Sequence, residues 1–338
     1  MTKQNTVLRL DAAPASHAVP VVRDLFAAVK TPGSNREDPL EALKAAIAGD
    51  KRFKLQFFRR RVVLFPAFEV AFRTAEFLIR QAEFLDEPGG LMILAEGGCG
   101  KSFIGEQLAL DFPKTESLYE LLVPVVFITI PDNHDEKALM VDLLSQLGER
   151  VGKNDFTTTE LEDKLIEAFR RVKCRCIFVD EAQRLDTTTK NRRQADRKMG
   201  PIGERLKTLY REAGVAIILA GTPSLQELVL SDQQYKTRWS ASVRLEPFAM
   251  GPEFQGVLNA LAALVPLAGT TDFSRIEVAS AIWTSCDGYF RRLKNLLCNA
   301  LAIAIDELAT SIAPQHLQQA YLRSSDFNKT NPFDALLR

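Results

Sequence analysis

The sequence predicts an α/β fold, in which a parallel five-stranded sheet is followed by a C-terminal helical lid. Three observations support this prediction. Short apolar runs alternate with amphipathic helical segments, a glycine-rich loop stands between the first run and a helix, and after residue 251 only helical periodicity remains.

Composition indicates a folded, soluble protein and limits its partners. Of 338 residues, 46% are hydrophobic and 25% charged, and the 43 basic residues balance the 43 acidic ones, so any DNA binding must come from local patches. Five cysteines and three histidines show no zinc-site spacing. Because the chain also lacks a signal-peptide pattern and an apolar run of membrane-spanning length, we expect a cytoplasmic protein with no membrane partner.

The N-terminal part is expected to have two sections. Residues 1–40 are rich in Pro, Ala, Asp and Ser and are expected to form a flexible arm. Residues 41–88 read as a helical lead-in that contains the basic stretch 51–61 and is broken at Pro66.

The core and lid follow. Residues 89–248 form the expected core, and its near-continuous apolar runs suit strands buried on both faces. Residues 249–325 are expected to form the lid, with helices at 276–286 and 290–308, and the polar tail 326–338 is expected to fray. The NPFD segment at 331–334 could dock a partner. The expected strands are 91–95, 125–130, 176–179, 215–220 and 243–245.

The glycine-rich loop has the composition of a P-loop. Such a loop turns backbone N–H groups around phosphate oxygens, places a Lys at the β and γ phosphates and a hydroxyl on Mg²⁺, and uses the following helix N-terminus to favour the anion. The motif departs from its pattern at Ala95, where the first glycine belongs. The predicted ATP-binding residues are Gly97, Gly98, Cys99, Gly100, Lys101, Ser102 and Phe103.

An acidic pair follows the third strand. Asp180 and Glu181 stand where a buried strand reaches the carboxyl edge of the sheet, the edge at which open α/β sheets bind ligands. We expect Asp180 to organise Mg²⁺ together with Ser102, and Glu181 to polarise the attacking water. The alternative is that the pair merely caps the next helix.

The fourth strand ends in Gly-Thr-Pro, which places the Thr222 hydroxyl beside the expected γ-phosphate. Thr222 is therefore a candidate polar sensor of the nucleotide. It is equally a candidate N-cap, because Thr followed by Pro is a common helix start.

Two arginine regions complete the predicted site. Arg238, just before the fifth strand, is a candidate arginine finger for a neighbouring subunit, with Arg244 as its rival. In the lid, Arg291 or Arg292 could return to the nucleotide of the same subunit.

The order P-loop, DEAQ, ILAGTP, an Arg before strand five and a GYxxRL lid helix resembles the AAA+ ATPases of the TniB/TnsC family, regulators of DNA transposition, over residues 59–300. The resemblance implies an AAA+ fold of the ASCE P-loop type. It implies ATP hydrolysis with Mg²⁺ by Lys101, Ser102, Asp180, Glu181 and Thr222. A G-x-x-R pattern selects Arg291 in the lid, whereas the family's G-Y-x-x-R-L favours Arg292.

The resemblance also implies partners. Family members form rings or filaments on double-stranded DNA and link a TniQ-like target selector to the transposase. The segment that matches the family's DNA-facing helix contains Lys137, and Thr157 lies further on; a solvated helix start is the alternative interpretation of this segment. The basic runs 51–61 and 190–198 are alternative DNA or partner surfaces.

Two other functions share much of this pattern. A DEAQ-type AAA+ ATPase can serve helicase loading or secretion, and a nucleotide-gated scaffold can bind ATP with little hydrolysis. The intact Glu181 argues against the scaffold.

Overall fold

The computed structural model describes residues 39–61, 63, 65–85, 89–132, 135–187, 199–324 and 330–337. Several predicted segments lie outside these residues: all but 39–40 of the N-terminal arm, the whole basic run 190–198, and 326–329 and 338 of the C-terminal tail. Within the described part, no helix has both the length and the apolar character needed to cross a membrane.

The predicted five-stranded parallel sheet is confirmed. Its spatial order is β4-β5-β6-β1-β7, and each adjacent pair is parallel. The three central strands are buried throughout, as expected for a sheet covered on both faces. The strands are β1 (Gly90–Ala95), β4 (Val125–Thr129), β5 (Cys176–Asp180), β6 (Ala216–Gly221) and β7 (Ala241–Leu245).

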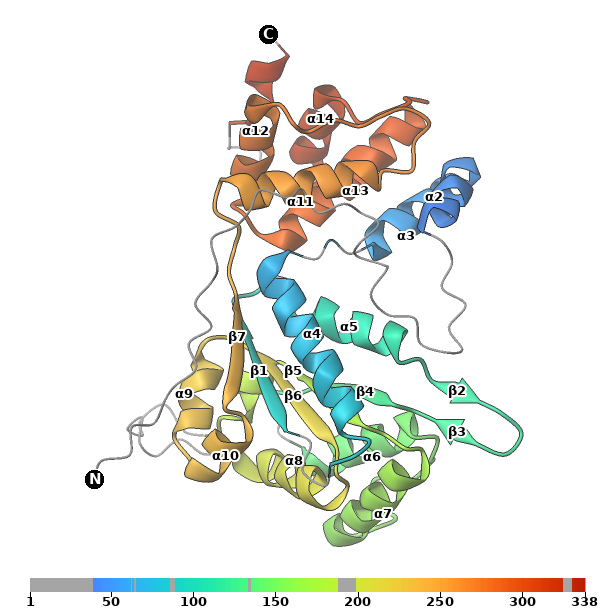
Figure 1. Ribbon diagram of the computed structural model, residues 1–338, viewed down its shortest axis with the longest axis vertical. Coiled ribbons are helices and arrows are strands. Elements are labelled where there is room, and N and C mark those ends of the chain that lie inside the picture. The colour runs from blue at the N-terminus through green and yellow to red at the C-terminus, as the bar shows by residue number, and fades with distance from the viewer. Residues whose placement is uncertain are drawn as a thin grey trace.

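Alternating side chains of the strands enter two different cores. In β1, Leu91 and Ile93 pack in the cluster that includes α4 and α5, whereas Met92 and Leu94 pack in the cluster that includes α6, α7 and α8. Helices therefore cover both faces of the sheet (Figure 1). They are α4 (Pro66–Gln81), α5 (Lys101–Asp111), α6 (Glu136–Gln146), α7 (Thr158–Arg171) and α8 (Gly200–Glu212), with the shorter α9 (Ser224–Leu230) and α10 (Gln233–Arg238) before β7.

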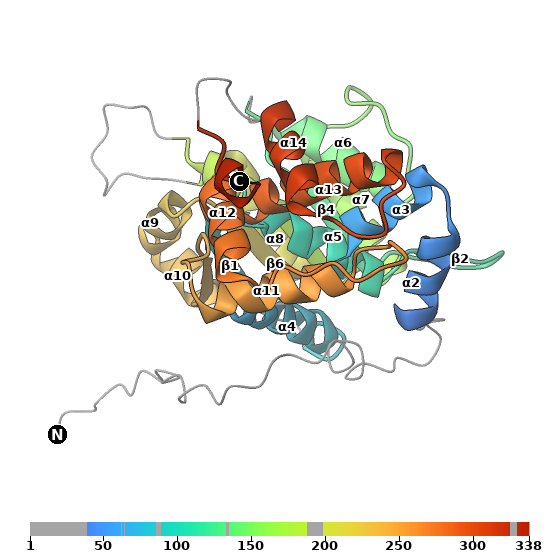
Figure 2. The ribbon, with the colours of Figure 1, turned by 90° about the horizontal axis from the view of Figure 1, so that it is seen from above.

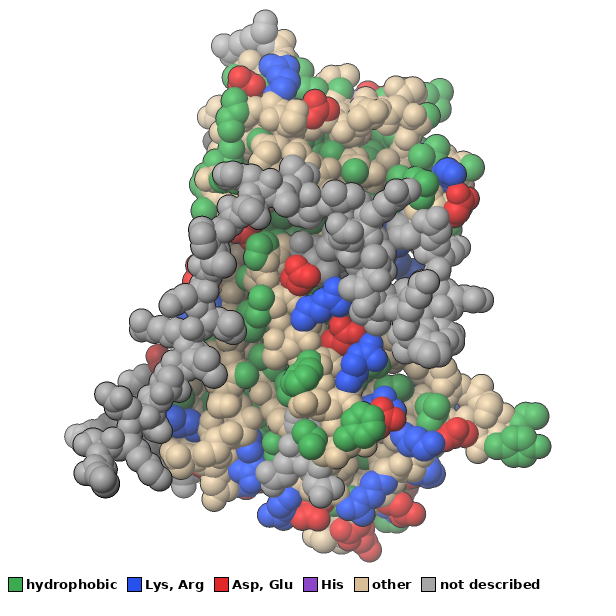
Figure 3. Space-filling view, in the orientation of Figure 1, with side chains coloured by type: hydrophobic (Ala, Val, Ile, Leu, Met, Phe, Trp, Pro, Cys, Tyr) green, Lys and Arg blue, Asp and Glu red, His purple; other side chains and the backbone are tan. Residues whose placement is uncertain are grey.

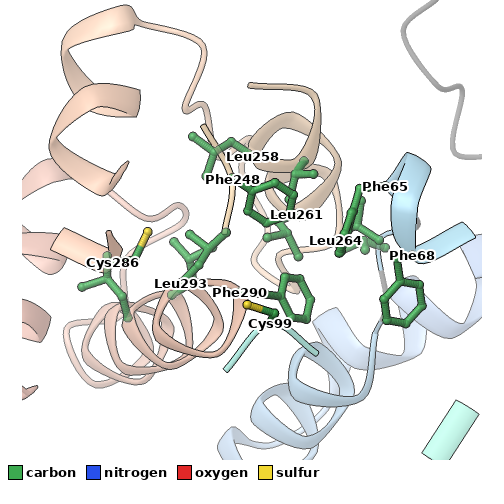
Figure 4. Packing of buried hydrophobic residues seen from close by; sticks show 14 of the residues in the cluster. Phe65, Phe68, Cys99, Phe248, Leu258, Leu261, Leu264, Cys286, Phe290 and Leu293 are labelled. Carbon is green, nitrogen blue, oxygen red and sulfur yellow. The ribbon is translucent and has the colours of Figure 1, made fainter. Parts of the chain in front are cut away.

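A helical lid lies beyond the carboxyl edge of the sheet (Figure 1), and from above its helices stand in front of the sheet (Figure 2). Aromatic side chains join it to the core: Phe248 and Phe290 from the lid side pack with Phe65 and Phe68 at the start of α4, beside Cys99 of the glycine loop (Figure 4). The lid helices are α11 (Pro252–Ala263), α12 (Ile276–Cys286), α13 (Phe290–Asp306) and α14 (Pro314–Ser324).

The predicted lead-in divides between lid and core. Helices α2 (Pro39–Ala48) and α3 (Lys51–Arg60) precede the break at Pro66, and α3 packs against α13 of the lid. Lys294 of α13 donates to the carbonyl oxygens of Phe58 (2.7 Å) and Arg61 (3.1 Å), which end α3. Helix α4, in contrast, packs on α5 and β7 of the core.

Two features differ from the sequence prediction. The tail was expected to fray, but Phe333 is fully buried, Asn331 donates to the Gln318 carbonyl of α14, and a short 3-10 helix η3 forms at Asp334–Leu336. A hairpin of β2 (Thr115–Glu116) and β3 (Leu121–Leu122) was not predicted. Its tip exposes Leu118 and Tyr119, and Figure 3 shows hydrophobic side chains at the end of this projection.

Candidate nucleotide-binding site

The glycine loop connects β1 to α5 at the carboxyl edge of the sheet. Gly98 and Gly100 have φ values of +95° and +104°, a left-handed backbone that glycine adopts without the steric cost of a Cβ. Ala95 is the last residue of β1 and pairs with Leu245, so its backbone is extended and does not need glycine. The departure from the P-loop pattern at Ala95 therefore leaves the loop's geometry intact.

Lys101 begins α5 and folds back over the loop. Its ammonium donates to the carbonyl oxygens of Ala95 and Glu96, and only 6% of the residue is exposed. Burial lowers the pKa of Lys101, while the carboxylates of Glu181 and Asp180 oppose that shift. The Lys101 ammonium thus lies at the loop, between the loop carbonyls and the carboxylates of Asp180 and Glu181.

Cys99 and Phe103 contribute to this site through packing. The side chain of Cys99 is 2% exposed, and burial raises the pKa of its thiol, which keeps the thiol neutral. Phe103 packs between Phe68 of α4 and Phe290 of the lid, at centroid distances of 6.2 Å and 6.1 Å. Both side chains fix the loop against the aromatic cluster of Figure 4.

Ser102 and Asp180 converge from different elements. The Ser102 hydroxyl of α5 donates to Asp180 Oδ2 at the end of β5, at 2.6 Å, and Asp180 is 5% exposed. A hydroxyl and a carboxylate are hard oxygen ligands, and Mg²⁺ in phosphate sites uses one or two protein ligands beside substrate phosphates and water. The described residues contain no group of three or more His, Cys, Asp or Glu placed to hold a metal.

Glu181 follows directly in a left-handed conformation, with φ 54° and ψ 34°. This backbone is uncommon for a residue other than glycine, although Lys173, Asp287 and Leu308 of this chain also adopt a positive φ. The Glu181 carboxylate accepts from Gln183 Nε2 at 2.7 Å and lies 3.8 Å from Arg184 Nε. The helix that follows, η1 (Ala182–Leu185), has no side-chain cap, so the capping role considered for the acidic pair is not observed.

Thr222 lies just beyond β6, on the same edge. Its backbone N–H donates to Gln183 Oε1 (3.1 Å), and its hydroxyl is 2.8 Å from the Ser224 hydroxyl. The N-cap of α9 is Pro223 and has no side-chain cap bond, so the Thr222 hydroxyl does not act as the expected cap.

The lid brings Arg291, rather than Arg292, to the loop. The Arg291 backbone N–H donates to the Gly98 carbonyl at 2.9 Å. Arg292 points elsewhere: its guanidinium pairs with Asp287 and lies over the Tyr289 ring, 4.9 Å from the centroid. Of the two predicted lid arginines, Arg291 is therefore the one that contacts the glycine loop, through its backbone, whereas the family pattern favoured Arg292.

A cleft of about 880 Å³ opens beside the loop. It begins at Gly100 and Ser102, runs along α5 to Leu110, and is closed by α13 and the end of α3. Arg59 and Arg60 line it together with Arg291, so its wall is basic. The basic stretch 51–61 is visible in the sequence, but its place beside the glycine loop depends on the packing of α3 against α13.

Comparison with known proteins decides the family. The model of the family described as "Bacterial TniB protein" matches residues 58–250, which is more than half of the chain. The chain belongs to the TniB family. No curated protein matches the sequence.

Solved structures confirm the AAA+ fold of this TniB-family chain. Aeropyrum pernix Orc1, solved in complex with DNA, is 16% identical with a TM-score of 0.57, over 81% of this chain and 70% of that one. Aeropyrum pernix Orc2, solved as ADPNP–ADP complexes, is 15% identical with a TM-score of 0.53, over 80% and 72%. Pyrobaculum aerophilum Cdc6p is also 15% identical, with a TM-score of 0.52, over 80% and 70%.

Arg238 lies at the opposite end of the sheet from the loop. It ends α10, and the next residue, Trp239, packs so closely on the start of β1 that a Cβ on Gly90 would lie 2.4 Å from its ring. The five residue steps from Gly90 to Ala95 span about 16 Å. Arg238 donates to the Gln234 carbonyl at 2.8 Å, with its guanidinium 5.8 Å from the Tyr210 centroid. Its rival Arg244, in β7, donates to the Gln226 side chain.

The two predicted DNA-contact residues lie near each other. Lys137 donates to the Phe156 carbonyl at 3.0 Å, next to Thr157, which caps α7 in a reciprocal capping box with Glu160. Both side chains are thus engaged within the chain. Asp135 caps α6, so the segment is the helix start that the alternative interpretation expected, while Asn133 and His134 lie outside the described residues.

Proposed function

We propose that this TniB-family protein is an ATP-dependent, DNA-associated regulator of transposition. In this proposal it oligomerises on target DNA and links a TniQ-like target selector to the transposase. The observation that carries it is the convergence of the glycine loop, the Ser102–Asp180 pair and Glu181 on one sheet edge, in a chain whose core matches the TniB family.

The site supports ATP hydrolysis through its own residues. Backbone N–H groups of Gly97 to Ser102 at the start of α5 would bind phosphate oxygens, and Lys101 would exchange its loop carbonyls for the β and γ phosphates. Ser102 and Asp180 would hold Mg²⁺, which supplies charge neutralisation between the phosphates when bound. Glu181 would then polarise the attacking water, with the Thr222 hydroxyl as the polar sensor.

The lid and the cleft would complete nucleotide binding. Arg291 is the lid arginine whose backbone contacts the loop, so we assign to it the contact with the nucleotide of the same subunit. Nucleotide complexes of Aeropyrum pernix Orc2 support this use of the fold.

The position of Arg238 supports assembly. The length of β1, roughly 16 Å, separates the loop from Gly90, on which Trp239 next to Arg238 packs, so we place the phosphate contact of Arg238 at the site of a neighbouring subunit. Arg238 would then act as an arginine finger in a ring or filament. Its rival Arg244 pairs with Leu94 near the carboxyl end of β1, so this distance argument does not apply to it.

Double-stranded DNA is the proposed platform for this assembly. Lys137 and Thr157, at the starts of α6 and α7, are the proposed contacts, and Aeropyrum pernix Orc1, which shares the fold, is solved with DNA. A phosphate contact by Lys137 requires it to leave the Phe156 carbonyl.

Particle imaging tests this proposal. The purified protein is imaged with duplex DNA and no nucleotide, ADP, or a non-hydrolysable ATP analogue. Rings or filaments are expected only when DNA and the ATP analogue are both present. Lys137→Ala should reduce them, while Lys173→Ala, two residues beyond the C-terminal end of α7, should not. Monomers under all conditions would contradict the assembly. Assemblies that form equally well with no nucleotide, with ADP and with the ATP analogue would contradict its ATP dependence.

A further inference from the structure

The side chain of Gln183 connects two parts of the candidate site. Its amide N–H donates to Glu181 Oε2 at 2.7 Å, and its amide oxygen accepts from the backbone N–H of Thr222 at 3.1 Å. Glu181 follows β5 and Thr222 follows β6, so one amide spans the carboxyl ends of two neighbouring strands.

The surroundings fix which way this amide points. Thr222 N–H can only donate and an ionised Glu181 carboxylate can only accept, so the amide oxygen must face Thr222 and the NH₂ group must face Glu181. Gly221 leaves room for it, because a Cβ there would lie 2.8 Å from Gln183 Oε1 and 3.1 Å from Gln183 N. The left-handed backbone of Glu181 holds the other end.

Glu181 has a second contact, with Arg184, on the side of β5 that faces β4. Arg184 lies 3.8 Å from the same carboxylate oxygen, and it is tied to the end of β4 by the Ile130 carbonyl (3.1 Å) and the Asp132 carboxylate (3.2 Å). The Gln183 bond is the shorter of the two contacts and the better hydrogen bond. The carboxylate is therefore held toward the end of β6, where Thr222 lies.

We propose that Gln183 is a positioning residue that directs the Glu181 carboxylate toward the end of β6, and that a displacement of Thr222 is transmitted to Glu181 through this amide. The proposal rests on the ATPase function proposed above. Among the described residues, the Gln183 side chain has hydrogen bonds only to Glu181 and Thr222 and none to the glycine loop or the Ser102–Asp180 pair, so it should affect turnover and leave nucleotide binding unchanged.

An isosteric change separates the two ends of the bridge. Gln183→Glu keeps an oxygen for Thr222 N–H but replaces the donor to Glu181 with a second carboxylate. Steady-state ATPase kinetics should show kcat lowered by about 10- to 100-fold, a part of the contribution of a positioned general base. KM and the Kd of a fluorescent non-hydrolysable ATP analogue should stay within about twofold of wild type. Gln183→Met, which removes both the donor to Glu181 and the acceptor for Thr222 N–H without adding charge, should also lower kcat.

Two controls make the result specific. Gln255→Glu makes the same chemical change in lid helix α11, where the amide donates to the Phe273 carbonyl, and should leave kcat unchanged. In a Glu181→Gln background, Gln183→Glu should cause no further loss, because its effect acts through Glu181.

The possible results bear on different claims. If the wild type hydrolyses ATP and both Gln183 variants have the same kcat as the wild type, the positioning role is overturned and the ATPase assignment stands. A loss of analogue binding equal to the loss of turnover would overturn it too, since the residue would then act on the whole fold of the site. Absence of turnover in the wild type, despite analogue binding, would contradict the ATPase function itself.

Discussion

At the scale of single residues, the hydrogen bond between Ser102 and Asp180 connects the start of α5, next to the glycine loop, to the end of β5. The hydroxyl donates to a carboxylate that is 5% exposed, so its removal leaves Asp180 Oδ2 without that partner. The same two oxygens are the proposed protein ligands of Mg²⁺. Stability and metal-dependent binding should therefore both depend on one hydroxyl.

Ser102→Ala should lower the free energy of unfolding by about 1–3 kcal/mol, the cost of leaving a buried charged acceptor short of a donor. It should also weaken binding of ATP with Mg²⁺ by about 10- to 100-fold, and weaken binding in EDTA much less. Denaturant titration and isothermal calorimetry measure the two effects. Ser102→Thr keeps the hydroxyl and is the control; equal losses with and without Mg²⁺ would contradict the assignment of Ser102 to the metal.

The positions of most residues of the candidate site could be predicted from local sequence. Asp180 and Glu181 follow a short buried strand, and Lys101 and Ser102 follow a glycine loop, so their neighbours in sequence fix where they lie. The role of Gln183 could not be predicted, because its partner Thr222 is 39 residues away. The choice between Arg291 and Arg292 is a turn of about 100° on one helix, which only the contact with Gly98 resolves.

At the scale of elements, the junction of α3 and α13 depends on the buried ammonium of Lys294. It donates to two carbonyls at the end of α3 and lies 4.4 Å from the Phe58 ring centroid. Burial lowers the pKa of Lys294 from 10.5 to about 8. The folded protein thus releases this proton more readily than the unfolded chain does.

The lowered pKa of Lys294 makes the free energy of unfolding depend on pH. Below pH 8 the residue is protonated in both states and its burial cost is constant; between pH 8 and 10.5 the unfolded chain binds more protons, so the free energy of unfolding rises with pH. The free energy of unfolding of the wild type minus that of Lys294→Met should rise by about 1–2 kcal/mol from pH 8 to 9.5, because only the wild type gains stability from this titration. Chemical denaturation in a Cys298→Ala background measures it, because the electrostatically coupled Cys298 thiol titrates nearby. A difference that stays flat over this range would contradict the lowered pKa.

Elements with sustained apolar patterns were predicted well, and those that depend on distant contacts were not. The predicted strand 125–130 is present as β4, which begins directly after Pro124, whereas the short strand β3 just before Pro124 pairs in a hairpin that was not predicted. Phe333 stands alone in a polar tail and has no periodic signal; it is buried because it meets Tyr321 of α14, 6.3 Å between ring centroids.

At the scale of the whole molecule, the sheet separates Arg238 from its own glycine loop. Figure 1 shows α10 at the lower end of the sheet and the lid at the upper end. A site built from two subunits would be incomplete in a monomer. ATP turnover should therefore depend on assembly, and sequence alone could place Arg238 before β7 but could not show this separation.

Mixing variants tests this arrangement. Arg238→Ala and Glu181→Gln should each lower kcat, the former by on the order of 10³-fold if it removes an arginine finger. Mixed in equal amounts with DNA, they should regain activity above the average of the two separate proteins, because an intact Glu181 then meets an intact Arg238 across an interface. Activity equal to that average would contradict a role in trans, and the same mixture with Arg244→Ala tests the rival residue.

The central claim is that the edge formed by the glycine loop, Asp180 and Glu181 hydrolyses ATP, and the most direct measurement is phosphate release by the wild type and Glu181→Gln with duplex DNA and Mg²⁺. We expect the wild type to turn over ATP, and Glu181→Gln to bind the nucleotide with similar affinity but lose turnover by about 10²-fold or more. Equal phosphate release by the two proteins would contradict the role of Glu181 and, with it, the proposed mechanism.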